Sequence, residues 1–521
     1  MRVKTVEGNV EEKMSDLKSV LRDLGGIFII VGFITLFSLV VPLFFGEYGS
    51  NCRFDAVTPL VITLFIFFGL GLPLYFGFKK ADPANFKTAM VTAALGWLFI
   101  SLISSIPFWL IPYDKVQMLH MTPLSAFFES MSGWTGTGLT MVANEEHLPY
   151  TLQFWRSLIQ WVGGVGVIVL TLSILARPGT GSFVLYKGEA RDQKTHPSIV
   201  STVRTIWWIF LMYTVIGITA LTIIGALSPP GVGMTPWESL NHAMTGLATG
   251  GFSVTDDSIA SFGTISQIAI LLLMVTGSIA FAAHYQLLKG RIKKFLSDPQ
   301  FKALITLIIL GVIGLTVVNF HNTQLYHDNF LLALKQSGFQ FVSAITCTGF
   351  STVQSFSSWS EPAKLILASA MIIGGAAGST SGGIKLFRAI LLYKGVGWRI
   401  KRAISTPRRV FVHKLGEKSL SKEEALDLIN EAAIISFMWA ILLIIGVLLI
   451  GVIFPERTLG DVIFEVCSAQ GNVGLSTGIT SIEMHPLAKI MLIFNMWVGR
   501  LEIIPIIVLI RSMFGIKRNI L

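Results

Sequence analysis

A short glycine-containing pattern occurs four times along this chain, and each copy lies between two apolar stretches long enough to cross a membrane. The four copies are TGTGLT at 135–140, ATGGFS at 248–253, TCTGFS at 346–351 and GNVGLS at 471–476. A pattern that returns about every hundred residues indicates a duplicated unit. We therefore predict four equivalent loops lining one pore, and cation permeation is the leading function.

The composition indicates that these repeats belong to a membrane protein. Hydrophobic residues make up 52% of the chain and charged residues 13%, whereas a soluble domain carries about 25% charged residues. Lysine and arginine gather in alternate connections, most densely over 385–422. This asymmetry predicts that both termini lie in the cytoplasm. The net charge of +10 does not indicate nucleic acid, because no basic stretch has room for a folded reader domain.

The apolar stretches predict the course of the chain through the bilayer. Stretches of about 20 residues can span it, and they lie near 25–45, 57–78, 88–111, 151–176, 204–227, 264–288, 303–320, 363–392, 430–453 and 486–511. Four shorter apolar segments precede the loops, at 122–134, 235–247, 329–345 and 459–470. These are too short to span and are predicted to be re-entrant half-helices. Thr122-Pro123 and Thr235-Pro236 are typical helix-start signals.

The predicted fold is an all-α polytopic membrane protein with four helix–re-entrant loop–helix units around one pore, plus an N-terminal helix pair. Residues 1–85 hold the N-terminal segment and the two extra helices. The repeats are expected at 86–195, 196–298, 299–398 and 399–521. The third includes an intramembrane gating loop, and the fourth includes a basic cytoplasmic connection. That connection, about 393–427, is expected to be partly helical and to contact a partner protein or anionic lipid.

The four loops align on one shared glycine: Gly138, Gly251, Gly349 or Gly474. Every repeat then has a hydroxyl residue two positions later and another six positions earlier. Rings of backbone carbonyls can replace the water of a dehydrated monovalent cation, and glycine tolerates the backbone angles this requires. The predicted carbonyl ligands belong to Thr137, Gly138, Gly250, Gly251, Thr348, Gly349, Val473 and Gly474. The alternative, glycines used only in turns or helix packing, explains four loops in register less well.

A polar residue also lies nine positions before each shared glycine. The four are Glu129, His242, Gln340 and Glu465. We expect them to brace the half-helix rather than to contact the ion.

The segment 371–385 is rich in glycine and serine within a membrane-length stretch. Such residues weaken a helix, and broken backbone at that depth persists only against protein or a water-filled cavity. We predict a flexible gating loop directly below the filter, although a tight small-residue helix crossing is the alternative. The predicted gating residues are Gly378, Ser379, Thr380, Ser381, Gly382, Gly383, Lys385 and Arg500. The shorter run Gly163–Gly166 is interpreted as packing.

Two arginines lie within apolar stretches. Arg500 is deep in the last one, where a charge normally faces a cavity or a partner. It either lines the pore below the filter or forms a structural ion pair with Glu502 or Glu465, and both interpretations stay open. Arg156 lies near a predicted helix start, so we expect its charge to snorkel to the membrane surface.

These residues resemble the Trk/Ktr/HKT superfamily of potassium transporters, in particular the TrkH/TrkG-type K+ uptake subunit. The resemblance covers about 88–515 and rests on the segments Trp161–Gly166, Gly374–Lys385 and Gly499–Glu502, together with the four shared glycines. It implies a K+ uptake subunit of the cell membrane, assembled as a homodimer with one pore per protomer. Gly378–Gly383 would be the family's gating loop, and Arg500 its pore-lining arginine.

The resemblance also implies a regulator and a preference among ions. A cytosolic TrkA-like protein with RCK domains that bind NAD or ATP would dock on the cytoplasmic face. No nucleotide site is visible in this chain, and K+ is expected as the transported ion without a covalently bound cofactor. In plant members, serine at the first filter glycine accompanies sodium permeation, so Gly138 favours K+ selectivity.

Other functions compete with this one. A Na+- or H+-coupled K+ symporter, or a less selective Na+/K+ transporter, could use the same fold. An enzyme is not predicted, because no metal-ligand pair at helical spacing and no nucleophile–base constellation is visible. Loss of a filter glycine would have favoured a sensor or scaffold, but all four are present.

Overall fold

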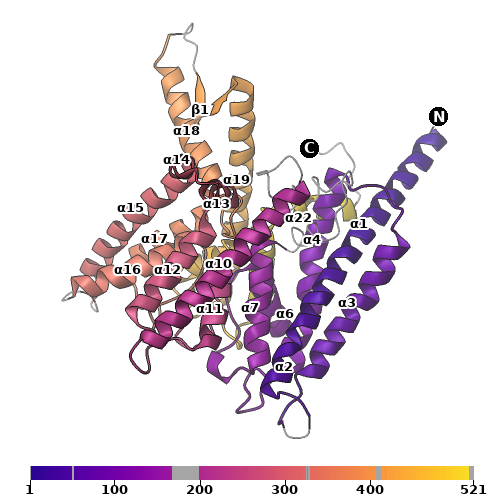
Figure 1. Ribbon diagram of the computed structural model, residues 1–521. Helices are drawn as coiled ribbons and strands as arrows, with labels where there is room; N and C mark the ends of the chain where they lie inside the picture. The colour runs from indigo at the N-terminus through magenta and orange to yellow at the C-terminus, as the bar shows by residue number, and fades with distance from the viewer. Residues whose placement is uncertain are drawn as a thin grey trace.

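The computed structural model describes residues 2–49, 52–166, 199–323, 326, 329–406, 412–416 and 418–514. The described chain is almost entirely helical, and the beginning of α1 (Arg2–Ser38) and the end of α22 (Ile504–Phe514) lie toward the same side (Figure 1). This arrangement agrees with the predicted all-α polytopic class.

An N-terminal helix pair packs against the first repeat. It consists of α1 and α3 (Val57–Gly77), with the short α2 (Val40–Phe45) in the connection between them. The backbones of α1 and α3 approach closely, because a Cβ on Gly25 would lie 2.5 Å from the amide nitrogen of Tyr75. Small residues that allow such an approach are the usual way in which membrane helices pack.

The same order of elements follows four times: an outer helix, a short buried helix, a segment without helix and a second long or broken helix. The elements are α4 (Phe86–Ile103), α5 (Ile106–Leu110), α6 (Pro123–Thr135), η1 (Glu145–His147) and α7 (Tyr150–Val165); then α10 (Ile199–Leu227), α11 (Pro236–Leu247), α12 (Thr264–Ser278), α13 (Phe281–Leu288) and α14 (Ile292–Ser297); then α15 (Pro299–Asn322), α16 (Phe330–Ile345), α17 (Glu361–Ile373) and α18 (Leu386–Ala403); and last α19 (Lys422–Ile453), α20 (Leu459–Gln470), α21 (Pro486–Arg500) and α22.

The short helices α6, α11, α16 and α20 match the four predicted half-helices to within one residue at each end. Each begins with a side-chain cap, in which Thr122, Thr235, Asn329 or Thr458 accepts a hydrogen bond from an amide in the first turn. The predicted start signals at Thr122-Pro123 and Thr235-Pro236 are therefore confirmed. Such caps replace a missing backbone partner at a helix end.

The number of unbroken spans differs from the ten that we predicted. Six helices in the described residues are long and apolar enough to cross a membrane, or eight if each bent pair is one span. The pair α12–α13 bends by 104° and the pair α21–α22 by 112°. The predicted span 363–392 is interrupted between α17 and α18, because glycine and serine break the helix there. The span 151–176 corresponds to α7, but residues 167–176 lie outside the described part of the chain.

The basic connection between repeats 3 and 4 contains strands as well as helix. The helix α18 continues to Ala403, and β1 (His413–Leu415) then pairs antiparallel with β2 (Lys418–Leu420) before α19 begins. The prediction of a partly helical connection therefore missed this hairpin, whose short strands are fixed by mutual pairing. In Figure 1 the hairpin projects on the side where the chain termini lie.

Candidate functional site

Each of the four short helices ends in the same backbone turn. The amide just before the shared glycine donates a 2.9 Å hydrogen bond to the carbonyl five residues earlier. The pairs are Thr137–Ser132, Gly250–Thr245, Thr348–Ser343 and Val473–Ser468. One residue before each of these donors, φ lies between 52° and 68°, at Gly136, Thr249, Cys347 and Asn472. These are Schellman caps, so the segments that follow, 136–140, 249–253, 347–351 and 472–476, leave their helices in the same local geometry. We call these segments the filter strands, after the role predicted for them.

The shared glycines form a closed ring of contacts between repeats. Each lies so near the next repeat that a Cβ would collide with a carbonyl oxygen there. The pairs are Gly138 with Gly250, Gly251 with Thr348, Gly349 with Val473 and Gly474 with Thr137. All four glycines also have φ between 76° and 102°, a region that glycine occupies without steric penalty. The fourth contact returns to the first repeat, so the eight residues predicted as ion ligands lie together around one ring.

The polar residue nine positions before the shared glycine contacts the hydroxyl residue two positions after it in all four repeats. The pairs and their distances are Glu129–Thr140 at 2.9 Å, His242–Ser253 at 2.9 Å, Gln340–Ser351 at 3.4 Å and Glu465–Ser476 at 2.8 Å. All four polar side chains on the half-helices are fully buried. Each bond joins a half-helix to the strand that follows it, which is the bracing arrangement that we expected.

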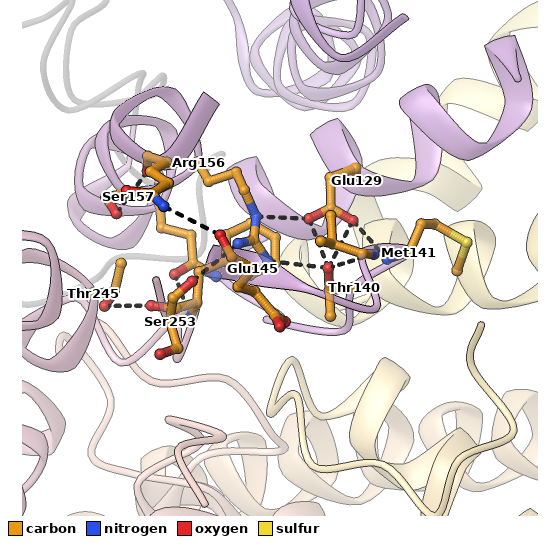
Figure 2. A network of polar contacts seen from close by, with 12 residues as sticks. Glu129, Thr140, Met141, Glu145, Arg156, Ser157, Thr245 and Ser253 are labelled. Atoms are coloured by element: carbon orange, nitrogen blue, oxygen red, sulfur yellow. Dashed lines mark hydrogen bonds and ion pairs between the residues drawn. The ribbon is translucent and has the colours of Figure 1, made fainter. Parts of the chain in front are cut away.

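Arg156 is buried in this network, so our expectation that its charge snorkels to the surface is wrong. Its Nε donates to Glu129 at 2.8 Å, and both side chains are at most 1% exposed (Figure 2). Its other nitrogens donate to the Thr140 hydroxyl and to the Ser253 carbonyl, each at 3.0 Å. The guanidinium also stacks 4.1 Å from the ring centre of Phe252. A buried carboxylate needs such a partner. The contacts of Arg156 with Ser253 and Phe252 also join repeat 1 to repeat 2.

A turn beyond the first filter strand carries a carboxyl with an altered pKa. This turn, η1, is joined to α7 by a hydrogen bond of 3.1 Å from the Gln153 side chain to the Glu145 carbonyl. Burial raises the pKa of the Glu145 carboxyl to about 8, although the nearby charge of Arg156 acts to lower it. The group is therefore mainly protonated and neutral at pH 7.

The predicted gating loop lies against the ends of three short helices. The Ser381 hydroxyl donates to the Thr346 carbonyl of α16 at 2.7 Å, and a Cβ on Gly382 would collide with the Gly471 carbonyl after α20. The Thr380 hydroxyl donates to the Leu247 carbonyl of α11 at 3.3 Å. Because those helices end in the filter strands, the loop lies next to the inner end of the ring.

The loop is also held by the broken helix of repeat 2. The Thr380 hydroxyl bonds to the Gly277 carbonyl and to the Thr249 hydroxyl, each at 2.9 Å. Backbone amides of the loop donate to the carbonyls of Ser278 and Gly277 at 3.0 and 3.2 Å. Residues of three repeats therefore hold it in place.

Arg500 connects this loop to repeat 1. Its guanidinium donates to the Thr380 carbonyl at 3.1 Å and to the Gly164 carbonyl at the end of α7 at 2.8 Å. Glu502, one partner considered from the sequence, forms an ion pair with Arg388. Glu465, the other, accepts hydrogen bonds from Ser476, Thr477 and Thr480 of its own loop. Lys385 donates to the Ser381 carbonyl within the loop.

The glycines at the end of α7 pack as interpreted from the sequence. A Cβ on Gly163 would collide with the Trp134 carbonyl, and one on Gly164 would lie 2.8 Å from the Ala248 carbonyl. Both contacts are with the ends of short helices, so these glycines let α7 approach α6 and α11 closely.

Comparison with known proteins agrees with this geometry. A family model described as a cation transport protein, TrkH, matches residues 58–516. The chain belongs to the TrkH family. It is 33% identical over 503 residues to an uncharacterized cation transporter of Methanocaldococcus jannaschii, covering 96% of each chain. It is 32% identical to the Trk system potassium uptake protein TrkH of Escherichia coli K12, covering 87% of this chain and 91% of that protein.

A solved structure extends the likeness to the fold of this TrkH-family chain. The crystal structure of the potassium transporter TrkH from Vibrio parahaemolyticus superimposes with a TM-score of 0.78 at 26% identity. The match covers 96% of this chain and 99% of that one. The all-α polytopic class is therefore confirmed, and the relatives of this chain are ion transporters.

Sequence reasoning missed three side chains that hold the filter strands of this TrkH-family chain: Arg156, Gln160 and Asn472. For Arg156 and Gln160 a signal was present, because the positions aligned with them in the other repeats are all apolar. Among the described residues, no group of three or more histidine, cysteine, aspartate or glutamate side chains is arranged to hold a metal ion.

Proposed function

We propose that this chain is a K+-selective permeation subunit for potassium uptake. The observation that carries the proposal is the closed ring of contacts. In it, each shared glycine lies against the carbonyl of the residue that comes just before the shared glycine of the next repeat. Such a ring supplies the backbone oxygens that replace the hydration shell of a monovalent cation. The names of the relatives, Trk system potassium uptake proteins, point to K+ as the ion.

The ion ligands in this proposal are the backbone carbonyls of the eight filter residues, two from each repeat. The Schellman caps aim each half-helix C-terminus, with its partial negative charge, toward the ring. Four carbonyl-bearing strands with the same cap can surround one cation without any charged side chain as a direct ligand.

The segment Gly378–Gly383 is proposed to gate the pore, together with Lys385 and Arg500. Its support is the set of hydrogen bonds from Thr380 and Ser381 to the ends of α11 and α16. An opening movement would break these few bonds, and the glycines at both ends of the segment permit a change in backbone angles.

Assembly and regulation form a further part of the proposal. The chain would form a homodimer in the cell membrane with both termini in the cytoplasm, and a cytosolic TrkA-like subunit that binds NAD or ATP would control the gate. The support is the hairpin β1–β2, which projects beside the basic end of α18 on the side of the termini (Figure 1). The repeat boundaries at 86–195, 196–298, 299–398 and 399–521 also stay part of the proposal.

The test is uptake of radioactive rubidium into proteoliposomes that contain this chain alone, with excess K+ or Na+ as competitor. Inhibition by K+ but not by Na+ is the expected result. Equal inhibition by both ions would contradict the selectivity. Absence of uptake both alone and after addition of a TrkA-like protein with nucleotide would contradict the function.

The same vesicles distinguish permeation from coupled symport. We expect uptake to follow the K+ gradient and the membrane potential alone. A requirement for an inward Na+ or H+ gradient would instead favour the symporter on this fold.

A further inference from the structure

The side chain of Gln160 reaches from α7 of repeat 1 to the filter strand of repeat 2. Its Nε2 donates to the carbonyl oxygen of Gly250 at 2.7 Å, and its Oε1 accepts from the amide of Phe252 at 3.0 Å. The side chain is fully buried. One glutamine therefore satisfies a carbonyl and an amide on two sides of the shared glycine Gly251.

The residue at position 250 makes room for this contact. A Cβ on Gly250 would lie 2.6 Å from Cδ and from Oε1 of Gln160. The aligned residues in the other repeats, Thr137, Thr348 and Val473, all carry side chains. Only repeat 2 has glycine at this position, and it is the repeat that the glutamine contacts.

In repeats 1 and 3, the threonine aligned with Gly250 forms a hydrogen bond to another threonine of the same repeat. The Thr137 hydroxyl bonds to the Thr135 hydroxyl at 2.7 Å and accepts from Asn472 at 2.9 Å. The Thr348 hydroxyl bonds to the Thr346 hydroxyl at 2.8 Å. Since Gly250 has no side chain, the amide of Gln160 takes the corresponding place from outside the strand.

This support is specific to one repeat. The residues 22 positions after the shared glycine in the other repeats are Leu273, Met371 and Met496. In repeat 2, Gly277 makes the helix contact that Gly163 makes in repeat 1, which puts Met274, also apolar, in the place of Gln160. These apolar residues lack an amide that could donate to a filter carbonyl. The ring is therefore asymmetric, with one of its four carbonyls held by a side-chain donor.

Resting on the proposed function, we propose that Gln160 is a positioning residue that fixes the Gly250 carbonyl and thereby sets the discrimination between K+ and Na+. A carbonyl ring selects among ions through its size and through the number and field strength of its oxygens. The glutamine occupies one lone pair of the Gly250 oxygen and so restricts its direction and field. Without it, a buried carbonyl and a buried amide lose their partners, and the strand shifts to recover them.

The test compares two glutamines on the same helix. Gln160→Met and Gln160→Leu place at this position the residue types that repeats 2, 3 and 4 carry, so both changes suit the local packing. The matched control is Gln153→Leu. Gln153 is also buried, and it likewise donates one hydrogen bond and accepts one, but its partners are the Glu145 carbonyl and the Trp237 side chain.

The measurement is rubidium uptake by proteoliposomes, with the ratio of the K+ and Na+ concentrations that half-inhibit it. Both Gln160 variants are expected to reduce the K+ preference about tenfold, which corresponds to the loss of one net hydrogen bond. The control should keep the wild-type ratio. A wild-type ratio in Gln160→Met would overturn the inference, as would an equal loss in Gln153→Leu.

Two further outcomes are decisive. Failure of both Gln160 variants to fold, while Gln153→Leu folds, would overturn the inference, because it would assign Gln160 to the fold and not to ion discrimination. A wild-type protein with no K+ preference would instead contradict the proposed function. The two claims are therefore tested by different numbers, the wild-type ratio and its change in the variants.

Discussion

The side-chain amide of Asn472 donates a hydrogen bond of 2.9 Å to the hydroxyl of Thr137, across 335 positions of sequence. The same nitrogen donates to the Met496 carbonyl at 2.9 Å. Asn472 has the positive φ that ends the last half-helix, directly after its C-cap Gly471, and Thr137 belongs to the first filter strand. The bond therefore joins the last repeat to the first at the point where the ring closes.

The first prediction removes this closing bond but keeps the backbone. Asn472→Gly retains a residue that adopts positive φ, as Gly136 does at the aligned position of repeat 1. Loss of the two hydrogen bonds leaves a buried hydroxyl and a buried carbonyl with fewer partners, which should reduce the free energy of unfolding by about 1–3 kcal/mol. Thermal unfolding in detergent would measure it, and an unchanged midpoint would contradict the closing role.

The second prediction concerns the buried pair of Glu129 and Arg156. Arg156→Leu introduces the residue found at the aligned positions of repeats 3 and 4, but it leaves a buried carboxylate without its cation. We expect a loss of about 3–5 kcal/mol. Adding Glu129→Gln, which copies Gln340 of repeat 3, should restore most of that loss. A double variant as unstable as the sum of the single variants would rule out coupling between the two side chains.

The third prediction tests the register of the filter. Gly138→Ser places a Cβ against the Gly250 carbonyl, so the ring must distort and should admit more Na+. We expect about a tenfold loss of K+ preference in the rubidium competition assay. Gly136→Asn is the control, since a Cβ at Gly136 meets nothing within 4 Å and repeat 4 carries asparagine there. Equal K+/Na+ discrimination in both variants and the wild type would refute the register.

The fourth prediction tests the gate. Thr380→Val keeps the shape of the side chain and removes the hydroxyl that bonds to Gly277 and Thr249. If the loop closes the pore, basal rubidium flux should rise about fivefold, as expected when one net hydrogen bond no longer favours the closed state. Ser369→Ala is the control, because that hydroxyl lies on α17 outside the segment and bonds to the Leu365 carbonyl of the same helix.

A stronger version of this experiment deletes Gly378–Gly383, which should also raise basal flux. Flux that remains low and regulated after the deletion would assign the gate to another segment.

The fifth prediction is a pH dependence at the turn beyond the first filter strand. Burial raises the pKa of Glu145 to about 8, so its carboxyl is neutral at pH 7 and gains a negative charge as the pH rises through about 8. A negative charge near the path of a cation raises its local concentration, so uptake should rise roughly twofold between about pH 7 and pH 9. Glu145→Gln should remove the rise, whereas Glu146→Gln should keep it.

The expected effect of pH on stability is opposite to its effect on uptake. Because the folded state holds the Glu145 proton more tightly than the unfolded chain does, the protein should lose stability as the pH rises from about 4.5 to about 8. Glu145→Gln should flatten this part of the stability curve, measured by thermal unfolding at each pH.

Much of the fold could be predicted from the sequence because it depends on interactions between residues that are close in the chain. The half-helices were predicted closely because Thr122 and Thr235, each followed by proline, set their starts through local hydrogen bonds. The four filter glycines were also recognised, since the need for positive φ at Gly138 and its equivalents is a local property of the backbone. The length of the apolar stretches and the uneven distribution of lysine and arginine predicted a membrane protein, because both are properties of the sequence alone.

The remaining features depend on contacts between distant residues. Hydropathy alone did not predict the sharp bends that break the last helices of repeats 2 and 4, because each bent pair taken together is still apolar enough for a membrane span. The burial of Arg156 depends on Glu129, which lies on another helix. The absence of a side chain at position 250 is explained by its contact with Gln160, which comes from the neighbouring repeat. The sequence by itself determined four equivalent loops, whereas tertiary packing decided how they differ, because each filter strand is held by side chains that the chain brings in from elsewhere.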